Sequence, residues 1–203
     1  MSTGLTERLD TIETLLDQTA GKTLSTALKS GLNSSRLIRC PSDYYNWPLS
    51  QRANFLNARS ENHLCKTLLM TNTRCINDDC SNKNNSKYYA VVVQYTEKLN
   101  SALFHEFLKS LPGNEGLSTI KHFNLRLISD EEAYQLTGYQ YNAVAPFGLT
   151  CGSSGIPVIV AKSVMDLVGE VFVGAGEVDV KLGLLPYDFE KIGVLIADIT
   201  LPR

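Results

Sequence analysis

The sequence predicts an α+β fold in which a mixed sheet or partial barrel is flanked by helices. One observation is the continuous apolar run at residues 88–95, which is typical of a strand buried on both faces. A second is the series of short apolar runs between residues 143 and 201, punctuated by Gly and Pro and interspersed with helical patterns. The 203 residues are enough for one domain with a sizeable core, with or without a short appendage.

Residues 1–35 are predicted to form an N-terminal helical extension, and residues 36–203 the main domain. An amphipathic helix is expected before Gly21, because apolar residues recur there at helical spacing with charged residues between them. This stripe of apolar residues is too short for an independent coiled coil. It is therefore expected to dock on the domain's own core, on a second copy or on another protein. Residues 19–35 are typical of a weak helix or a linker. The stripe consists of Leu5, Leu9, Ile12 and Leu16.

The middle of the chain alternates helical and strand patterns. In order, we expect a helix at 50–57, strands at 64–70 and 88–95 separated by a polar loop at 71–87, a helix at 99–111 and a strand at 123–128. Ser129 and Glu132 have the spacing of a capping box for a further helix, which Gly138 ends. Later apolar runs predict short strands at 143–149, 156–161, 171–174, 178–182 and 194–201, with helices at 162–168 and 186–192.

Composition and cysteine spacing favour a cytoplasmic protein without a metal or cofactor. No run of 18 apolar residues is present, and the N-terminus lacks the basic-then-apolar order of a signal peptide, so no membrane span is expected. The five cysteines include no C-x-x-C pair, which is typical of free thiols in a reducing compartment. A zinc site is the disfavoured alternative, since its candidate ligands have no standard spacing. Those candidates are His63, Cys65, Cys75 and Cys80.

Charge is distributed unevenly along the chain. The net charge is −2, which argues against a general nucleic-acid binder, but residues 19–127 carry +7 and residues 128–203 carry −6. Such asymmetry is typical of a phosphate-facing side on a protein that is neutral overall, although a solvated surface explains it equally well. The candidates for contact with a phosphate backbone are Lys83, Lys87, Lys98, Lys109, Lys121 and Arg126.

Familiar catalytic motifs are missing from the sequence. Only three histidines are present, none beside a Gly-x-Ser-x-Gly elbow, and there is no Walker loop or dinucleotide fingerprint. Any enzyme with this sequence therefore works mainly by positioning its substrate.

Two segments are candidates for a functional site. Lys66 interrupts an apolar strand, where an ammonium needs a cavity, a partner or water; the alternative is the wet face of an amphipathic strand. The strand before Gly174 runs into Gly174-Ala175-Gly176, where backbone N–H groups can hold a phosphate or an oxyanion, or simply form a hairpin turn. Pro146-Phe147-Gly148 ends another apolar run and reads alone as a turn.

Taken together and in order, these segments resemble the YbaK/ProX family, the freestanding relatives of the editing domain inserted in bacterial prolyl-tRNA synthetases. The resemblance covers most of the chain. The residues that carry it are Ala58-Arg59-Ser60, His63-Leu64-Cys65-Lys66-Thr67-Leu68, Asn142-Ala143-Val144-Ala145-Pro146-Phe147-Gly148-Leu149, Ile156-Pro157-Val158, Val171-Phe172-Val173-Gly174-Ala175-Gly176-Glu177-Val178-Asp179-Val180-Lys181-Leu182-Gly183-Leu184, Pro186 and Ile196-Ala197-Asp198-Ile199.

The resemblance implies a compact domain that hydrolyses the ester between an amino acid and the terminal ribose of a mischarged tRNA. It implies that Lys66 lines the pocket, that Gly174, Ala175 and Gly176 form the family's glycine-rich loop, and that Phe147 lies near the rim. The ester is already activated, so positioning and charge stabilisation can suffice without a protein nucleophile. The implied substrate-binding residues are Pro146, Phe147, Gly148 and Asp179.

The resemblance leaves partners and activity open. The expected partners are mischarged aminoacyl-tRNA and either a synthetase assembly or a second copy held through the N-terminal helix, without membrane or DNA. The alternatives are a non-catalytic module that binds tRNA or a synthetase assembly, and an unrelated α+β ligand-binding domain. The sequence does not reveal which amino acid is removed, because single methyl groups in a pocket discriminate by only about 1–3 kcal/mol.

Overall fold

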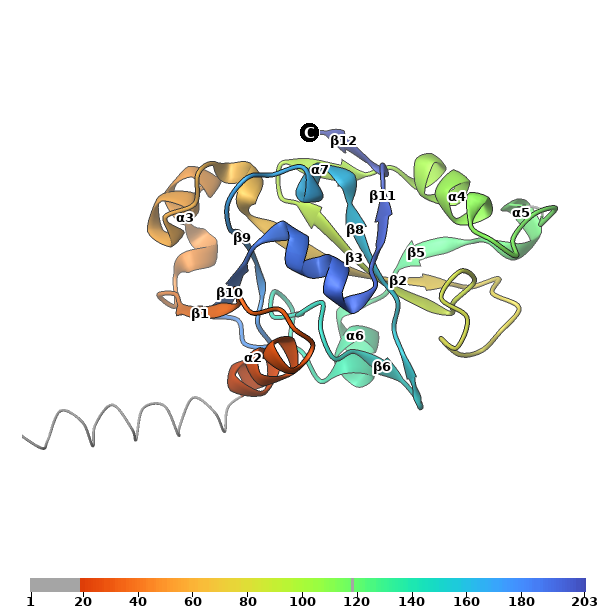
Figure 1. The fold of residues 1–203 in the computed structure, drawn as a ribbon, viewed down its shortest axis with the longest axis horizontal. Helices are drawn as coiled ribbons and strands as arrows, with labels where there is room; N and C mark the ends of the chain where they lie inside the picture. The colour runs from red at the N-terminus through yellow and green to blue at the C-terminus, as the bar shows by residue number, and fades with distance from the viewer. Residues whose placement is uncertain (1–18, 118) are drawn as a thin grey trace, which may run out of the picture.

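A mixed five-stranded sheet forms the centre of the molecule in the computed structural model, which describes residues 19–117 and 119–203. The central strand, β3, pairs antiparallel with β2 on one side and parallel with β8 on the other. The edges of the sheet are β5 and β11 (Figure 1). The strands, in sheet order, are β11 (Leu195–Ala197), β8 (Val158–Ala161), β3 (Tyr88–Gln94), β2 (Cys65–Asn72) and β5 (Leu125–Leu127).

The prediction of a central buried strand at 88–95 is confirmed. Val91, Val92 and Val93 of β3 are completely buried, because helices and the second sheet cover both faces of this strand. Burial on both faces explains why the run is apolar without alternation. The α+β prediction with a mixed sheet is confirmed as well.

A three-stranded antiparallel sheet adjoins the central one. Its strands are β1 (Arg36–Arg39), β10 (Val180–Leu184) and β9 (Val171–Gly174), in that order. A bridge between Leu64 and Phe172 links it to the start of β2, which gives the arrangement of a partial barrel. Two small ribbons complete the strands: β4 (Glu97–Leu99) with β12 (Thr200–Pro202), and β6 (Thr150–Cys151) with β7 (Ser154–Gly155).

Helices flank the sheets, and capping residues mark where two of them begin or end. The helix expected at 99–111 is α4 (Ser101–Ser110), where the Asn100 side chain accepts hydrogen bonds from the backbone of Ala102 and Leu103. Ser129 caps α6 (Asp130–Thr137) as predicted, and Gly138 ends it in the left-handed conformation. The other helices are α2 (Thr19–Lys29), α3 (Leu49–Leu56), α5 (Thr119–His122), α7 (Lys162–Met165) and the 3-10 turns at Tyr44–Asn46, Glu61–His63 and Pro186–Ile192.

Three predicted elements differ from the structure. Residues 143–149 contain no strand, because Ala143, Ala145 and Phe147 are buried by packing against other elements without joining a sheet. The helix expected at 162–168 ends at Met165, and the segment at 186–192 is a 3-10 helix. An apolar run records burial, and burial does not require strand pairing.

The segment after Thr19 packs on the domain. Ala20 and Ala27 of α2 are fully buried, and the Ala20 N–H donates to the Glu177 carboxylate at 2.9 Å. The stripe of apolar residues at 5–16 lies outside the described residues. Within the described part of the chain, no helix has the length and apolar character needed to cross a membrane.

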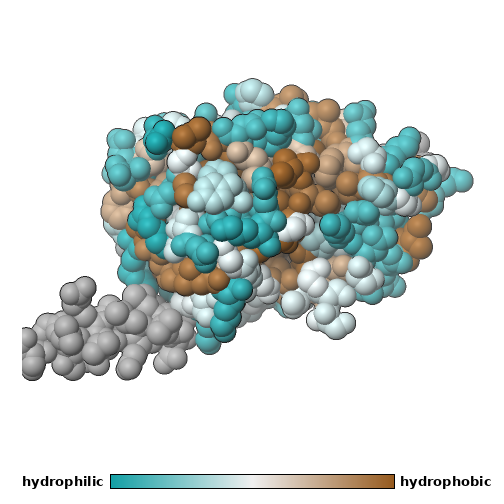
Figure 2. Space-filling view, in the orientation of Figure 1, coloured by the Kyte–Doolittle hydropathy of each residue, from teal (hydrophilic) through white to brown (hydrophobic). Residues whose placement is uncertain are grey.

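The surface in the orientation of Figure 1 mixes hydrophilic and apolar side chains, and apolar atoms gather where β8 and β11 are drawn (Figure 2). Ile196 of the edge strand β11 is 42% exposed.

A buried carboxylate joins the 3-10 helix at 186–192 to the segment between α2 and β1. Asp188 is 1% exposed and accepts hydrogen bonds from the Ser34 N–H at 3.0 Å, the Ser34 hydroxyl at 2.5 Å and the Lys191 ammonium at 2.6 Å. Burial opposes ionisation, but the hydrogen bonds from Lys191 and Ser34 outweigh it and hold the pKa of Asp188 below its usual value.

We expect Asp188→Ala to lower the free energy of unfolding by about 2 kcal/mol, because it leaves the Ser34 donors unpaired. A depressed carboxylate pKa stabilises the fold above the unfolded pKa of about 4, and this stabilisation is lost as the pH falls toward the folded value. Urea unfolding between pH 3 and 7 measures both effects. The surface carboxylate of Asp166, ion-paired with Lys162, provides the matched control Asp166→Ala. Equal pH dependence in wild type and Asp188→Ala would contradict the assignment.

Candidate functional site

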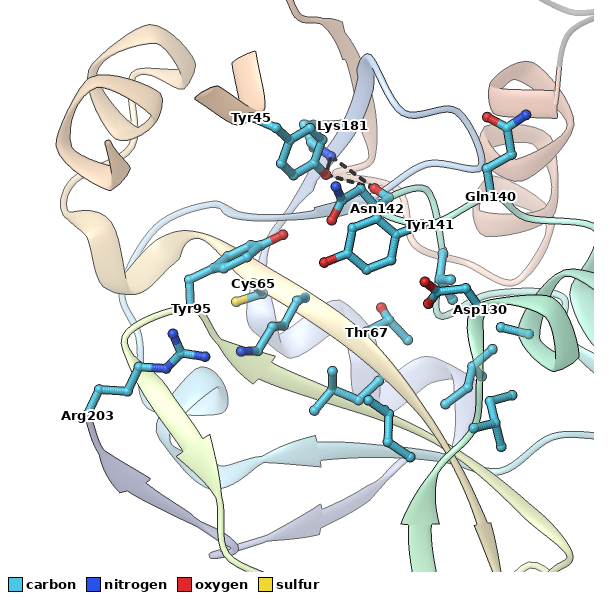
Figure 3. A pocket seen from close by; sticks show the side chains of 18 residues that line it. Tyr45, Cys65, Thr67, Tyr95, Asp130, Gln140, Tyr141, Asn142, Lys181 and Arg203 are labelled. Carbon is cyan, nitrogen blue, oxygen red and sulfur yellow. Dashed lines mark hydrogen bonds between the residues drawn. The ribbon is translucent and has the colours of Figure 1, made fainter. Parts of the chain in front are cut away.

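A cavity of about 340 Å³ lies where the two sheets meet. Its wall is built from β2, from Gly174 and Lys181 of the second sheet, from the start of α6 and from the connection at 140–144 (Figure 3). The lining residues are Tyr45, Cys65, Lys66, Thr67, Leu68, Leu69, Tyr95, Leu127, Ile128, Asp130, Ala133, Gln140, Tyr141, Asn142, Val144, Gly174, Lys181 and Arg203.

Lys66 lines this cavity from β2, where it pairs with Val93. The side chain is half-buried, and its Nζ lies 5.5 Å from the centroid of the Tyr95 ring. Burial lowers the pKa of Lys66, and the positive charge of Arg203 lowers it further. No carboxylate lies within ion-pair distance of Lys66 among residues 19–117 and 119–203. Its charge is therefore available to a ligand.

Lys181 is a second lysine in the same cavity, and it was not predicted from the sequence as a site residue. It is 5% exposed, and its ammonium donates to the Tyr45 hydroxyl and, at 3.5 Å, to the Asn142 carbonyl. Burial lowers the pKa of Lys181 to about 8. The signal that identified Lys66, a lysine inside an apolar strand, is also present at Val180-Lys181-Leu182 and could have identified Lys181.

Tyrosines connect the two lysines along one wall. The Tyr45 hydroxyl donates to the Asn142 carbonyl at 2.7 Å, while the Arg52 guanidinium lies 5.2 Å from the Tyr45 ring and 5.9 Å from the Tyr95 ring. Burial raises the pKa of both tyrosines, so their hydroxyls are neutral at physiological pH. Sequence patterns did not indicate that these residues meet, because they come from separate loops and strands.

Two polar side chains that line the cavity, Thr67 and Asp130, lack a hydrogen-bond partner and an ion-pair partner, respectively, in the described part of the chain. Thr67 has a buried hydroxyl with no hydrogen-bond partner in the described part of the chain. Asp130, the first residue of α6, is exposed at the cavity wall and makes no ion pair with a described residue. Figure 3 shows Asp130 and Tyr95 on opposite sides, with Lys181 beside Tyr45 and Arg203 at the far end from Lys181.

The glycine-rich segment forms the β9–β10 hairpin, with Gly174 as the last residue of β9. Only Gly174 of this segment lines the cavity, because the chain at 143–144 packs directly on the hairpin. The Gly176 N–H donates to the Ala143 carbonyl at 2.8 Å. The expectation of free N–H groups along 174–176 is therefore corrected for Gly176, whose donor stabilises the hairpin.

Other residues implied by the resemblance lie apart from the lining. Phe147 is 4% exposed and stacks on Phe189 in the core with ring centroids 5.9 Å apart, so its expected place at the rim is wrong. Pro146 is buried, and Gly148 is exposed with Thr26 beside it. Asp179 forms an ion pair with Arg39 at 2.6 Å. The structure thus brings together Lys66 and Gly174 but not these four.

The basic candidates for tRNA contact are spread over several elements. Lys83, Lys98, Lys109, Lys121 and Arg126 are exposed. Lys87 is half-buried and lies 3.8 Å from Asp78.

The histidine and cysteines considered for zinc have other neighbours. His63 Nδ1 lies 3.0 Å from the Ser60 hydroxyl and its Nε2 3.2 Å from the Val168 carbonyl, while Cys75 contacts Asn85. Residues 19–117 and 119–203 contain no cluster of three or more His, Cys, Asp or Glu placed to hold a metal ion. All five cysteines are free thiols.

Comparisons with known proteins identify the class to which this fold and cavity belong. The sequence model of the aminoacyl-tRNA editing domain matches residues 50–192. The fold resembles a crystal structure of a candidate trans-editing enzyme for prolyl tRNA synthetase, with a TM-score of 0.69 and 16% identity over 92% of this chain and 99% of that one. It also resembles a hypothetical protein with a TM-score of 0.60 and 22% identity over 82% of this chain and 91% of that one.

The family match covers more than half of the sequence and includes Lys66 and Gly174. The chain therefore belongs to the aminoacyl-tRNA editing domain family, which confirms the resemblance to the YbaK/ProX group. A search of curated protein sequences gave no match.

Proposed function

We propose that the protein is a trans-editing aminoacyl-tRNA deacylase that hydrolyses the ester of mischarged tRNA. One observation carries this proposal: the Lys66 ammonium borders a cavity in an editing-domain fold and has no carboxylate partner within the described residues. A cationic donor at that place is free to hold the ester carbonyl and the negative charge that develops on it.

The reaction needs no protein nucleophile. The oxygen of a water molecule attacks the ester carbonyl carbon, and the resulting oxyanion is stabilised by Lys66 with the backbone at Gly174 nearby. The bond between the carbonyl carbon and the ribose oxygen then breaks. The proton lost by the water passes to the ribose oxygen, directly or through the neighbouring ribose hydroxyl, so free amino acid and tRNA leave. Placement of the activated ester beside a fixed charge supplies the rate enhancement.

The tRNA body is proposed to bind the basic middle of the chain. Lys83, Lys98, Lys109, Lys121 and Arg126 present exposed cations, and Arg203 lies at the cavity wall. Backbone phosphates are the natural ligands of such side chains, and their contribution to affinity decreases as salt is added.

Incubation of the purified protein with a panel of tRNAs, each carrying a labelled amino acid, tests the proposal. We expect at least one mismatched aminoacyl-tRNA to lose its label faster than the uncatalysed reaction, with free amino acid as product. Tight binding of charged tRNA or a synthetase without any hydrolysis across the panel would replace the enzyme with a non-catalytic module.

A further inference from the structure

Lys181 presents a buried positive charge without a neutralising partner. It is 5% exposed, and no carboxylate lies within ion-pair distance of it among residues 19–117 and 119–203. Asp179 acts on it only through space and is itself ion-paired with Arg39. Removing a charge from water without a counter-ion is costly, so the site gains from an anion that enters the cavity.

The surroundings of Lys181 leave it able to bind a ligand. Two N–H groups of the ammonium are used by the Tyr45 hydroxyl and, weakly at 3.5 Å, by the Asn142 carbonyl. The third has no partner in the described part of the chain. The Tyr45 and Tyr44 rings, with centroids 4.5 Å and 5.7 Å from the ammonium, stabilise the charged group through cation–π contacts.

The three cations that line the cavity differ in how deeply they are buried. Lys181 is its most buried cation, Lys66 is half-buried and Arg203 is exposed. A substrate that is attached to a bulky tRNA inserts its acyl group first and leaves its phosphates outside. The exposed Arg203 is therefore the cation that phosphates can reach, whereas Lys181 meets the part of the acyl group that is farthest from the tRNA.

Asp130 adds a negative charge to the lining of the cavity. Its exposed carboxylate lies on the opposite side from Tyr95 in Figure 3 and suits the α-ammonium of an aminoacyl group. With the α-ammonium at Asp130 and the ester carbonyl at Lys66, the side chain of the amino acid extends toward Lys181 and Tyr45.

From this arrangement we infer that the cavity selects aminoacyl esters whose side chain ends in a carboxylate, and that Lys181 is the residue that recognises this carboxylate. The inference rests on the proposed deacylase function and specifies its substrate class. The remaining N–H of Lys181 donates to the carboxylate, and the Tyr45 ring supports the ammonium. A neutral oxygen acceptor of the same shape gains the hydrogen bond but not the charge attraction.

The test compares aspartyl, asparaginyl and alanyl esters on the same tRNA with wild-type protein. We expect kcat/KM to be highest for the aspartyl ester, by about tenfold over the asparaginyl ester, because a charge-assisted hydrogen bond is stronger than a neutral one. Lys181→Met is expected to remove this preference, with a loss of at least about tenfold on the aspartyl ester and about threefold or less on the alanyl ester. Lys162→Met, on the surface of α7, is the matched control and should keep the wild-type preference.

The pH dependence of the aspartyl-to-asparaginyl ratio gives a readout that a purely structural lysine would not change. Because the pKa of Lys181 is lowered to about 8, its charge is lost above that pH and the ratio should fall toward one. Forming a ratio cancels the intrinsic effect of hydroxide on esters. The titratable or charged groups around Lys181 are Cys40, Tyr44, Tyr45, Arg52 and Asp179.

The possible outcomes distinguish failure of the inference from failure of the proposed function. Hydrolysis with a preference for the alanyl ester, equal rates for aspartyl and asparaginyl esters, or equal losses on all esters in Lys181→Met would overturn the inference and leave the deacylase intact. No hydrolysis of any ester by wild-type protein would overturn both. If Lys181→Met does not fold, as judged by thermal unfolding, the substrate preference of the wild-type protein and the pH dependence of that preference still test the inference.

Discussion

Lys66→Ala is expected to lower aminoacyl-ester hydrolysis by at least about tenfold, equivalent to about 1.4 kcal/mol of transition-state stabilisation. The Lys66 side chain borders the cavity from β2, with its ammonium 5.5 Å from the Tyr95 ring centroid and without a described carboxylate partner. Truncation removes the charge that holds the developing oxyanion. The loss should appear in kcat more than in KM, since the interaction is strongest in the transition state.

Folding stability should change little in Lys66→Ala. A lysine whose pKa is lowered on folding opposes folding at neutral pH, and this cost disappears as the pH rises above the folded pKa. Single-turnover rates and urea unfolding of the same preparation measure the two effects separately. Lys162→Ala, which removes an exposed lysine of α7 that has no role in the proposed site, is the control for lost surface charge. Full single-turnover activity in Lys66→Ala would remove this residue from the mechanism.

Gly174→Ala is expected to destabilise the domain by about 3 kcal/mol or more, the upper part of the range for overpacking. A Cβ atom at Gly174 would lie 2.3 Å from the Val144 carbonyl oxygen and 3.0 Å from the Ala143 carbonyl oxygen. Both are backbone atoms, and the Gly176 N–H bond to Ala143 holds them in place. The contact cannot be relieved by rotating a side chain, so the 143–144 segment must move away from the hairpin.

Urea unfolding of Gly174→Ala measures this loss. Gly155→Ala is the matched control, because a Cβ there meets no atom within 4 Å and its backbone is not in the left-handed region. The control should stay within about 1 kcal/mol of wild type. A Gly174→Ala variant as stable as Gly155→Ala would show that the chain at 143–144 yields easily.

The fold was predictable from sequence where local pattern and burial coincide. The run at 88–95 is buried on both faces, and Ser129 and Gly138 mark the ends of α6 because caps act within a few residues. The run at 143–149 was wrongly predicted to be a strand, because its backbone at 143–144 packs on the β9–β10 hairpin and Phe147 stacks on Phe189 without any strand pairing. An apolar pattern predicts which residues are buried, but it does not predict which elements bury them.

The candidate site was predictable only in part. Lys66 was identified because a charge interrupts an apolar strand, and the same rule applied to Lys181 would have identified the second lysine. Tyr45, Asp130 and Arg203 carry no such local signal. They reach the cavity because distant turns and strands meet there, and sequence spacing alone contains no measure of that distance.

The parallel pairing of β3 with β8 has a consequence for how the chain acquires this fold. β2 and β3 are neighbours in sequence and can pair once residues 65–94 have left the ribosome, but the other edge of β3 waits for residues 158–161. Pairings across such long separations form slowly, because the intervening loop must close first. Until then, the largely apolar β3 has an open edge that another nascent chain can occupy. We therefore expect a chain that ends before residue 158 to aggregate more readily than the complete domain, in which β8 covers this edge of β3.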